Sequence, residues 1–285
     1  MKWKEKTVAV TGAGGGIGRQ LVLQLLARGA SVAAVDINQQ ALEETRRQAT
    51  AYGERLSLHR VNITDRNAVC SLPHEVEEKH GRIDALINNA GIIQPFVPFS
   101  ELDYETMQRV ININLFGMMY MTRAFLPFLA GRPEAHIANV SSMGGFLPVP
   151  GQTLYGASKA GVKLLTEGLK AELSRSKIGV SVIMPGGIAT DIVKNSGVES
   201  SIKPAEQSGK AAAKLTTPEE AARTILDGIE KNRSRILVGK DAKFLDLFSR
   251  IAPLKAGRFI SRMMSSSHSE TFTKTEDLKV RECAG

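Results

Sequence analysis

The chain has 285 residues, of which 42% are hydrophobic and 23% are charged, and this ordinary composition excludes a wholly disordered or fibrous protein. Its only cysteines, Cys70 and Cys283, exclude a disulfide framework and a cysteine zinc cluster, and they predict a reducing, cytoplasmic compartment. The formal net charge is +8, but residues 231–262 carry nine Lys or Arg against two Asp, so the excess is local and a nucleic-acid partner is not expected.

We expect neither a membrane-spanning helix nor a bound metal. No stretch approaches the roughly 18 consecutive apolar residues that a spanning helix needs. The first residues lack the apolar core of a secretory signal. The five histidines show none of the spacings that bind a metal ion.

Seven short apolar runs, bounded by Gly, Asp, Asn or Pro, predict β-strands. In chain order they are Val8–Val10, Ser31–Val35, Leu56–Val61, Ala85–Asn88, His136–Val140, Val180–Met184 and Ile236–Val238. Helix-length segments lie between them: Ile17–Arg28, Gln39–Ala51, Asp103–Leu129, Leu154–Lys177 and Pro218–Lys231. This alternation predicts an α/β fold, a single Rossmann-type doubly wound seven-stranded parallel sheet over residues 1–240, with helices on both faces and a C-terminal helical extension.

A glycine-rich turn joins the first predicted strand to the first helix, with Gly12, Gly16 and Gly18 in a Gly-x-x-x-Gly-x-Gly spacing. A pyrophosphate needs a tight turn, close backbone approach and free N–H groups at a helix N-terminus, and side chains would obstruct that approach. The strand–turn–helix context favours a dinucleotide site over a plain flexible turn. Its expected contacts are Gly12, Gly14, Gly15, Gly16 and Ile17.

Asp36 ends the second predicted strand, eighteen residues after Gly18. A carboxylate at this place can accept hydrogen bonds from both hydroxyls of the adenosine ribose, and it would repel the 2′-phosphate of NADP. The next residue, Ile37, supplies no compensating cation. We therefore expect NAD as the cofactor; the alternative role for Asp36 is a helix N-cap.

Tyr155 and Lys159 are spaced i and i+4, so their side chains share one face of the predicted helix. A nearby ammonium lowers the pKa of a phenol, which is about 10 in a free tyrosine, so the pair can exchange a proton with an alcohol or a ketone. Ser142 follows the fifth predicted strand and can hold the substrate oxygen beside the phenol. Asn114 lies in a helical stretch, although Asn is a poor helix former, which indicates a polar role. The plainer alternatives are that Ser142 is an ordinary turn residue and that Asn114 is a buried amide with all its hydrogen bonds made within the protein.

In order and spacing, these motifs resemble the short-chain dehydrogenase/reductase family over about residues 5–240. The matching pieces are Thr11–Gly18, Asn88-Asn-Ala-Gly91, Asn114, Ser142, Tyr155-x-x-x-Lys159 and Pro185-Gly-Gly-Ile-Ala-Thr190. The resemblance implies a catalytic tetrad of Asn114, Ser142, Tyr155 and Lys159. In it Tyr155 is the acid/base and Ser142 polarises the carbonyl. Lys159 lowers the pKa of Tyr155 and binds the nicotinamide ribose, and Asn114 holds a water that relays protons to Lys159.

The same resemblance implies further cofactor contacts and an oligomer. Asn62 and Ile63 stand where the family usually has Asp-Val at the adenine, and Asn62 can still accept a bond from the adenine amine. The Asn88–Gly91 segment is expected to support the central sheet. Contacts on the adenosine side are Asn89, Ala90 and Gly91, and those on the nicotinamide side are Pro185, Gly186, Ile188 and Thr190. Family members are usually dimers or tetramers, packed through the helices that carry Asn114 and Tyr155, so we expect a homodimer or homotetramer.

The expected substrate pocket is apolar. Its predicted contacts are Ser142, Met143, Phe146 and Tyr155, with Ile93, Phe96, Leu147 and Val193 as neighbours. No arginine stands there to bind a carboxylate or phosphate, which favours a hydrophobic, steroid-like or lipid-like secondary alcohol or ketone. Polar residues 191–216 follow the carboxyl end of a strand, and we expect a mobile lid there, with a plain surface insertion as the alternative.

Residues 241–285 form a basic amphipathic extension with a loose polar tail. Phe244, Leu247, Phe248 and Ile251 recur at i, i+3, i+4 and i+7, and Lys and Arg stand among them. One interpretation is a helical pair that covers the core or an oligomer interface. The other is peripheral binding of residues 241–264 to an anionic membrane.

The motifs together predict an NAD-dependent oxidoreductase that transfers a hydride between nicotinamide and a secondary alcohol or ketone. The alternatives are a noncatalytic NAD(H)-sensing or scaffold protein on the same fold, and an epimerase or dehydratase that uses the same Tyr–Lys pair. The complete set of Asn114, Ser142, Tyr155 and Lys159 argues against sensing, because sensing alone does not need it.

Overall fold

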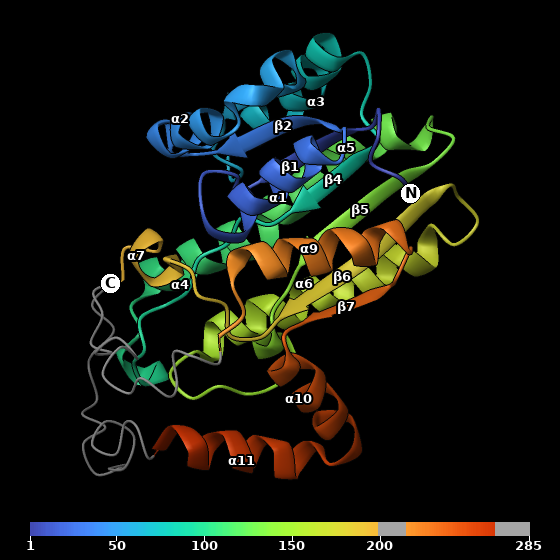
Figure 1. The fold of residues 1–285 in the computed structure, drawn as a ribbon. Helices are drawn as coiled ribbons and strands as arrows, with labels where there is room; N and C mark the ends of the chain where they lie inside the picture. The colour runs from blue at the N-terminus through green and yellow to red at the C-terminus, as the bar shows by residue number, and fades with distance from the viewer. Residues whose placement is uncertain (199–214, 266–285) are drawn as a thin grey trace.

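The computed structural model describes residues 1–198 and 215–265 and contains one seven-stranded parallel sheet (Figure 1). The strand order is β3-β2-β1-β4-β5-β6-β7. The strands are β1 (Thr7–Thr11), β2 (Ser31–Asp36), β3 (Leu56–Arg60), β4 (Ala85–Asn88), β5 (Ala135–Val140), β6 (Ile178–Pro185) and β7 (Arg235–Val238). Each predicted strand is present, with ends that differ by at most two residues, and the predicted doubly wound sheet is confirmed.

Helices cover both faces of the sheet. They are α1 (Gly16–Ala27), α2 (Gln39–Gln48), α3 (Arg66–His80), α4 (Tyr104–Ile111), α5 (Met118–Ala130), α6 (Thr153–Glu172), α7 (Ile192–Asn195), α9 (Pro218–Glu230), α10 (Lys240–Ile251) and α11 (Pro253–Ser265). Helices α1, α2 and α9 pack on one face, and α3, α5 and α6 pack on the other. Helix α6 ends at Glu172, before the predicted Lys177, because the Ser176 hydroxyl bonds Leu173 O and the N–H of Ile178, which favours a turn.

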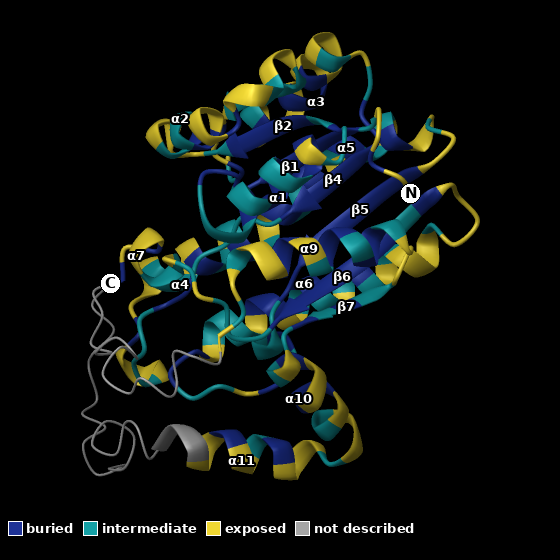
Figure 2. Cartoon of the chain, in the orientation of Figure 1, coloured by how far each residue is buried: buried dark blue, intermediate teal, exposed yellow. Residues whose placement is uncertain are grey.

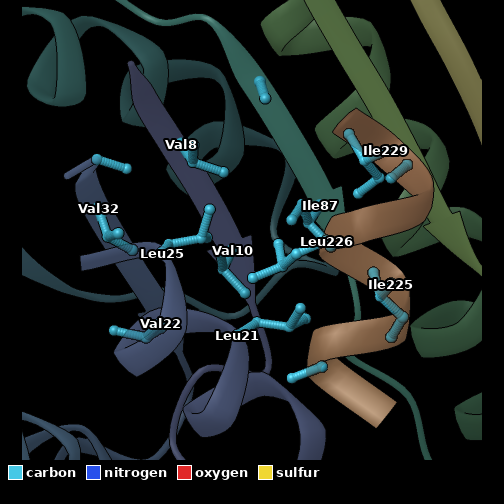
Figure 3. Packing of buried hydrophobic residues seen from close by; sticks show 14 of the residues in the cluster. Val8, Val10, Leu21, Val22, Leu25, Val32, Ile87, Ile225, Leu226 and Ile229 are labelled. Atoms are coloured by element: carbon cyan, nitrogen blue, oxygen red, sulfur yellow. The ribbon is translucent and has the colours of Figure 1, made fainter. Parts of the chain in front are cut away.

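Successive residues of each central strand point into opposite layers, as the two-residue period of a strand requires. Val8 and Val10 of β1 pack with Leu25 of α1 and Leu226 of α9 (Figure 3). Ala9, between them, packs in the second core with residues of α3 and α5. Both faces of β1 are therefore sealed from water, and this strand can contact a ligand only at its ends.

The order of the strands reverses at β1. This strand pairs with β2 on one side and with β4 on the other. The connections that leave the two strands therefore diverge, which opens a crevice beyond their carboxyl ends, and ligands of doubly wound sheets bind at such a point.

The predicted helix over Asp103–Leu129 is an unbroken helical stretch that contains one π-helical turn, η3 (Asn112–Gly117), between α4 and α5. Residues Tyr104–Ala130 are long and apolar enough to cross a membrane by length and composition alone. In this structure, however, Met121, Phe125 and Leu129 are fully buried in the core against the sheet. The π-turn carries Asn114, and such turns are frequent at functional sites.

The C-terminal extension is a helical hairpin of α10 and α11, which leaves the carboxyl edge of the sheet after β7 (Figure 1). Its inner residues Leu245, Ala256 and Ile260 are buried against Leu147. Exposed residues line the rest of the hairpin (Figure 2). The predicted loose tail over 266–285 lies outside the described residues.

Replacing His136 with Gln should make the fold less sensitive to acid. His136 is buried on β5 beside Ser181, with Nε2 and Oγ 2.8 Å apart, and burial lowers its pKa from 6.5 to about 3. Below pH 6.5 the unfolded chain therefore binds a proton that the folded chain excludes, so stability falls as the pH drops toward 3. Near pH 4.5 this cost is about 3 kcal/mol.

Urea unfolding at neutral pH and near pH 4.5 checks this expectation. The natural protein should lose about 3 kcal/mol more between the two pH values than the His136→Gln variant. An equal loss in both proteins would show that another group controls the acid sensitivity.

Candidate active site

A cleft of about 600 Å³ opens at the carboxyl edge of the sheet, between the glycine-rich turn and α6. It is lined by every residue that was predicted to contact the cofactor: Gly12, Gly14, Gly15, Gly16, Ile17, Asp36, Asn62, Ile63, Asn89, Ala90, Gly91, Tyr155, Lys159, Pro185, Gly186, Ile188 and Thr190. Residues that the sequence reasoning missed also line it, among them Arg19, Asp191 and Asn195. The parallel strands thus bring together positions that lie up to 183 residues apart in the chain, from Gly12 to Asn195.

The glycine-rich turn fits a pyrophosphate. Helix α1 begins after Gly15, which makes no side-chain cap bond, and no acidic residue stands in its first turn. The first N–H groups of a helix have no partner within the helix, so they are free to bind an anion here. Gly12 has a φ of +66°, and an added Cβ would lie 2.9 Å from the Cα of Ala90. Only glycine satisfies both restrictions.

Asp36 stands at the far end of this turn and is tied to it. Its Oδ2 accepts a hydrogen bond from Gly14 N at 2.9 Å, and its Oδ1 accepts one from Asn38 N at 3.0 Å. The N-cap of α2 is Asn38 rather than Asp36, so the alternative role for Asp36 is wrong. The side chain is partly exposed in the cleft, and its remaining lone pairs can accept bonds from two hydroxyl groups.

Arg19 is the cation that the sequence reasoning overlooked at this end of the cleft. Its guanidinium donates to the carbonyl of Gly14 and, at 3.1 Å, to Oγ1 of Thr45. The expectation that no cation stands near Asp36 rested on the chain neighbour Ile37 alone. The fold instead supplies Arg19 from the first turn of α1, and no pattern in the chain indicated which way this side chain points.

The Asn88–Gly91 segment holds the central strands together, as the family resemblance implies. Asn88 Nδ2 donates to Thr122 Oγ1 at 3.0 Å and to Asn139 Oδ1 at 2.8 Å. The next residue, Asn89, donates from Nδ2 to Thr11 O at 3.0 Å. These bonds fix the switch point between β1 and β4, where the cleft opens.

Asn62 is less available to an adenine than the resemblance implies. Its Oδ1 already accepts hydrogen bonds from Thr64 N at 3.0 Å and from Thr64 Oγ1 at 2.8 Å. A third donor would have to share or displace these bonds, because a carbonyl oxygen has two lone pairs. The bond from Asn62 to the adenine amine remains a prediction.

Tyr155 and Ser142 meet across the cleft. The Ser142 hydroxyl hydrogen-bonds the Tyr155 phenol, while Ser142 Oγ also accepts a bond from Gly144 N at 3.1 Å. Burial raises the pKa of the Tyr155 phenol, and the bond to Ser142 opposes that effect. The predicted lowering of this pKa by Lys159 is not found: burial is the larger effect, and what opposes it is the bond to Ser142 rather than the charge of Lys159.

Lys159 lies one turn after Tyr155 and is pinned to the end of β5. Its Nζ donates to Val140 O at 3.0 Å and stands 5.9 Å from the centre of the Tyr155 ring. Its own backbone carbonyl accepts a bond from Ser141 Oγ at 2.6 Å. Burial lowers the pKa of Lys159 to about 8, so this amine exchanges its proton far closer to neutrality than an exposed lysine does.

Asn114 is a buried clamp beneath the cleft rather than part of its wall. Its Oδ1 accepts from Ile92 N at 2.8 Å, and its Nδ2 donates to Ile92 O at 2.9 Å and to Ser158 Oγ at 3.0 Å. The amide thereby joins the segment after β4 to α6 and uses both of its hydrogens. This is the satisfied buried amide of the plainer alternative, and the water relay remains a prediction.

The loop after β6 is held by a residue that the sequence did not point to. Asp241, in the first turn of α10, accepts a hydrogen bond from Gly187 N to its Oδ2 at 2.7 Å. Across the cleft, the Thr190 side chain lies close to Gly16, where an added Cβ would be 3.2 Å from its Cγ2. The predicted lid over 191–216 begins as α7; its residues 199–214 lie outside the description.

The residues of the predicted apolar pocket do not all lie in one place. Ile93 lines the cleft. Met143, Phe146 and Leu147 instead pack against the α10–α11 hairpin, because its apolar inner face covers them. Phe96 and Val193 are not in the cleft wall. Substrate contact by Met143 and Phe146 remains a prediction.

Gln94 is a positioning residue that was not predicted. It is fully buried, and its Oε1 accepts hydrogen bonds at 2.9 Å from the N–H groups of Leu154 and Tyr155, in the first turn of α6. Its Nε2 donates to Gly151 O at 3.0 Å. The only sign of this role in the sequence is that Gln94 is a single polar residue within an apolar run. The sequence could not show its hydrogen-bond partners, because they lie about sixty residues away in the chain.

Replacing Gln94 with Leu should lower the free energy of unfolding by about 1–3 kcal/mol, because two buried N–H groups lose their acceptor. The matched control is Gln152→Leu. It removes a single hydrogen bond, from Gln152 Nε2 to Gln94 O, and its Oε1 has no partner to lose among the described residues. Urea unfolding measures both variants. A loss as large in the control would contradict the role given to Gln94.

Comparisons with known proteins agree with this geometry. Residues 6–200 match the family model described as short chain dehydrogenase. A putative oxidoreductase of Mycobacterium tuberculosis, SadH, is 35% identical over 251 residues, which cover 86% of this chain and 90% of that protein.

Two solved structures, each 26% identical to this chain, share its fold. A short-chain dehydrogenase/reductase from Burkholderia phymatum in complex with NAD has a TM-score of 0.74, over 83% of this chain and 90% of that one. A short-chain dehydrogenase from Burkholderia cenocepacia in complex with NADP has a TM-score of 0.76, over 91% and 99%. With its sheet, its cleft and these relatives, the chain belongs to the short-chain dehydrogenase/reductase family of oxidoreductases.

Proposed function

We propose that this protein is an NAD-dependent dehydrogenase that interconverts a secondary alcohol and its ketone. One observation carries the proposal: the hydrogen-bonded Ser142 and Tyr155, with Lys159 one turn away, line the same cleft as the glycine-rich turn. Proton transfer and nucleotide binding can therefore act on one bound pair of molecules. A site for binding alone would not need a buried phenol and amine facing each other.

The chain itself supplies the proton chemistry. Nicotinamide, when bound, would supply hydride transfer to or from the substrate carbon. The Tyr155 phenol protonates the oxygen of a ketone, and the Ser142 hydroxyl holds that oxygen by a hydrogen bond. In the oxidation the alcohol loses a hydride and a proton, and the phenolate form of Tyr155 takes that proton, so the phenol must first give up its own.

Burial sets the protonation states of the pair. It raises the pKa of Tyr155, so the phenol keeps its proton at neutral pH and is ready to protonate a ketone oxygen. It also lowers the pKa of Lys159 to about 8, so this amine can pass a proton on to water near neutral pH. We infer that Lys159 returns a proton to the Tyr155 phenol or removes one from it. The Lys159 Nζ lies 5.9 Å from the centre of the Tyr155 ring.

Asp36 supports NAD as the cofactor. Its carboxylate lies in the cleft wall and is bonded to Gly14, next to the turn that suits the pyrophosphate. A 2′-phosphate there would meet its negative charge. The positive charge of Arg19 could attract the 2′-phosphate of NADP. That effect is small, because the Arg19 guanidinium is already bonded to Gly14 O and Thr45.

The substrate class and the oligomer are further proposals. Ile92 and Ile93 present apolar surface in the cleft, which suits a hydrophobic alcohol.

Phe116 and Leu164, on the helices that carry the site, expose 40% and 70% of their surface. We propose that this face pairs two copies, and sedimentation velocity measures the resulting mass.

Replacing Tyr155 with Phe should reduce turnover by at least about 10²-fold, since the phenolic oxygen is the only atom removed and it carries the proton. The assay follows NADH absorbance with NAD and secondary alcohols that range from short aliphatic compounds to steroids. Tyr52→Phe, which removes a phenol in the turn that follows α2, outside the cleft lining, is the matched control and should keep full activity.

Binding of NADH, followed by its fluorescence, should be the same in both variants. Unchanged turnover in Tyr155→Phe would overturn the role of the phenol. Binding of NADH without turnover of any alcohol would favour a nucleotide-sensing protein.

Replacing Asp36 with Ser should move the preference toward NADP by about tenfold or more, because the repelling charge is gone. Adding Arg19→Gln should leave most of that gain, because the guanidinium is committed to Gly14 O and Thr45. Dissociation constants for NADH and NADPH measure both changes. Tighter binding of NADPH than of NADH by the unchanged protein would contradict the proposal.

A further inference from the structure

The α10–α11 hairpin has a buried side that accounts for only part of its apolar residues. Leu245, Ala256 and Ile260 pack toward Leu147, beside the segment that follows the catalytic Ser142. An added Cβ at Gly257 would lie 3.3 Å from Pro148 Cγ, so α11 approaches that segment closely. Burial of the inner face therefore explains why the hairpin folds against the domain. It does not explain why the outer face also carries apolar residues.

The outer face is apolar along α10. Phe244, Leu247 and Ile251 are 62%, 59% and 74% exposed, and their i, i+3, i+7 spacing places them in one stripe opposite the buried residues. Leu254, at the start of α11, is 79% exposed and Phe259 is 46% exposed. Five large apolar side chains thus face water on one short hairpin, and a patch of this kind marks an interaction surface.

Basic side chains surround these apolar residues. Lys240 and Lys243 on α10, and Lys255 and Arg258 on α11, are exposed, and none of the four pairs with an acid that the structure describes. The acids of the hairpin are used elsewhere. Asp241 bonds Gly187 N, and Asp246 is buried beside Arg235 at 2.7 Å.

We propose that the outer face of α10–α11 binds an anionic lipid surface. Exposed Phe, Leu and Ile suit the boundary between headgroups and acyl chains, and the Lys and Arg around them suit anionic headgroups. A second copy of this chain fits the face poorly, because a twofold contact would bring its uncompensated positive charges together. Nucleic acid fits poorly as well, since three of the five exposed apolar side chains are aliphatic and offer bases nothing to stack on.

Docking in this way leaves the cleft outside the lipid but close to it. The hairpin joins the domain through Asp241 at the loop after β6 and through Leu147 after Ser142. Binding to lipid depends on neither turnover nor the cofactor, so it can be measured whatever the activity of the protein proves to be.

The test is flotation of the full chain with phosphatidylcholine vesicles that contain or lack phosphatidylglycerol. At about 50 mM NaCl the protein should bind only the anionic vesicles, and about 1 M NaCl should release most of it, because the Debye length falls to about 3 Å. Lys255→Gln/Arg258→Gln should lower the partition coefficient about 25-fold, at about fivefold for each charge. Leu247→Gln/Ile251→Gln should lower it at least about tenfold.

The matched control is Lys231→Gln/Arg233→Gln, which removes two exposed charges before β7, at the end of that strand opposite to α10. Its partition coefficient should fall by far less than that of Lys255→Gln/Arg258→Gln. Circular dichroism establishes that all variants are folded. The proposal is overturned if the full chain stays unbound at low salt, or if the control loses as much binding as the hairpin variant. It is also overturned if Leu247→Gln/Ile251→Gln splits an oligomer in sedimentation velocity, which would assign the face to a second copy.

Discussion

Seven parallel strands can be joined only by crossovers, and this constraint organises the whole protein. Each crossover carries a helix, so both faces of the sheet are covered, and every strand points its carboxyl end to the same edge. Only this edge is left for chemistry. It collects the glycine-rich turn after β1, Asp36 of β2, the asparagine segment after β4 and Ser142 after β5. The site is thus a consequence of how a parallel sheet must be connected.

Placement of the proposed proton-transfer groups depends on the tight seating of α6 against the end of β5. Ser141 and Val140 bind Lys159 through its backbone and its amine, and Gln94 accepts bonds from Leu154 N and Tyr155 N in the first turn of the helix. The bonds to Lys159 are buried and those to Gln94 are partly buried, so each would be costly to break. The same burial that makes the helix rigid raises the pKa of Tyr155 and lowers that of Lys159. Rigidity and acid–base behaviour therefore have a single physical origin.

The hairpin of α10 and α11 is joined to this site at two places. Asp241 holds the backbone of the loop after β6, and Leu147 carries the segment after Ser142 to the inner face of the hairpin. An element that looks like an appendage in Figure 1 is therefore tied to two segments that continue from cleft residues, the loop after β6 and the segment after Ser142.

Local sequence patterns already contain the order of strands and helices, the glycine-rich turn, Asp36 and the spacing of Tyr155 and Lys159, because each is a pattern within one or two turns of chain. Tertiary structure alone decided that Gln94 caps α6 and that Asp241 holds a distant loop, since their partners are about sixty and fifty residues away. It also decided that Met143 and Phe146 pack under the hairpin. The direction of the Tyr155 pKa belongs here too, because it follows from burial, and burial exists only once distant segments have packed together.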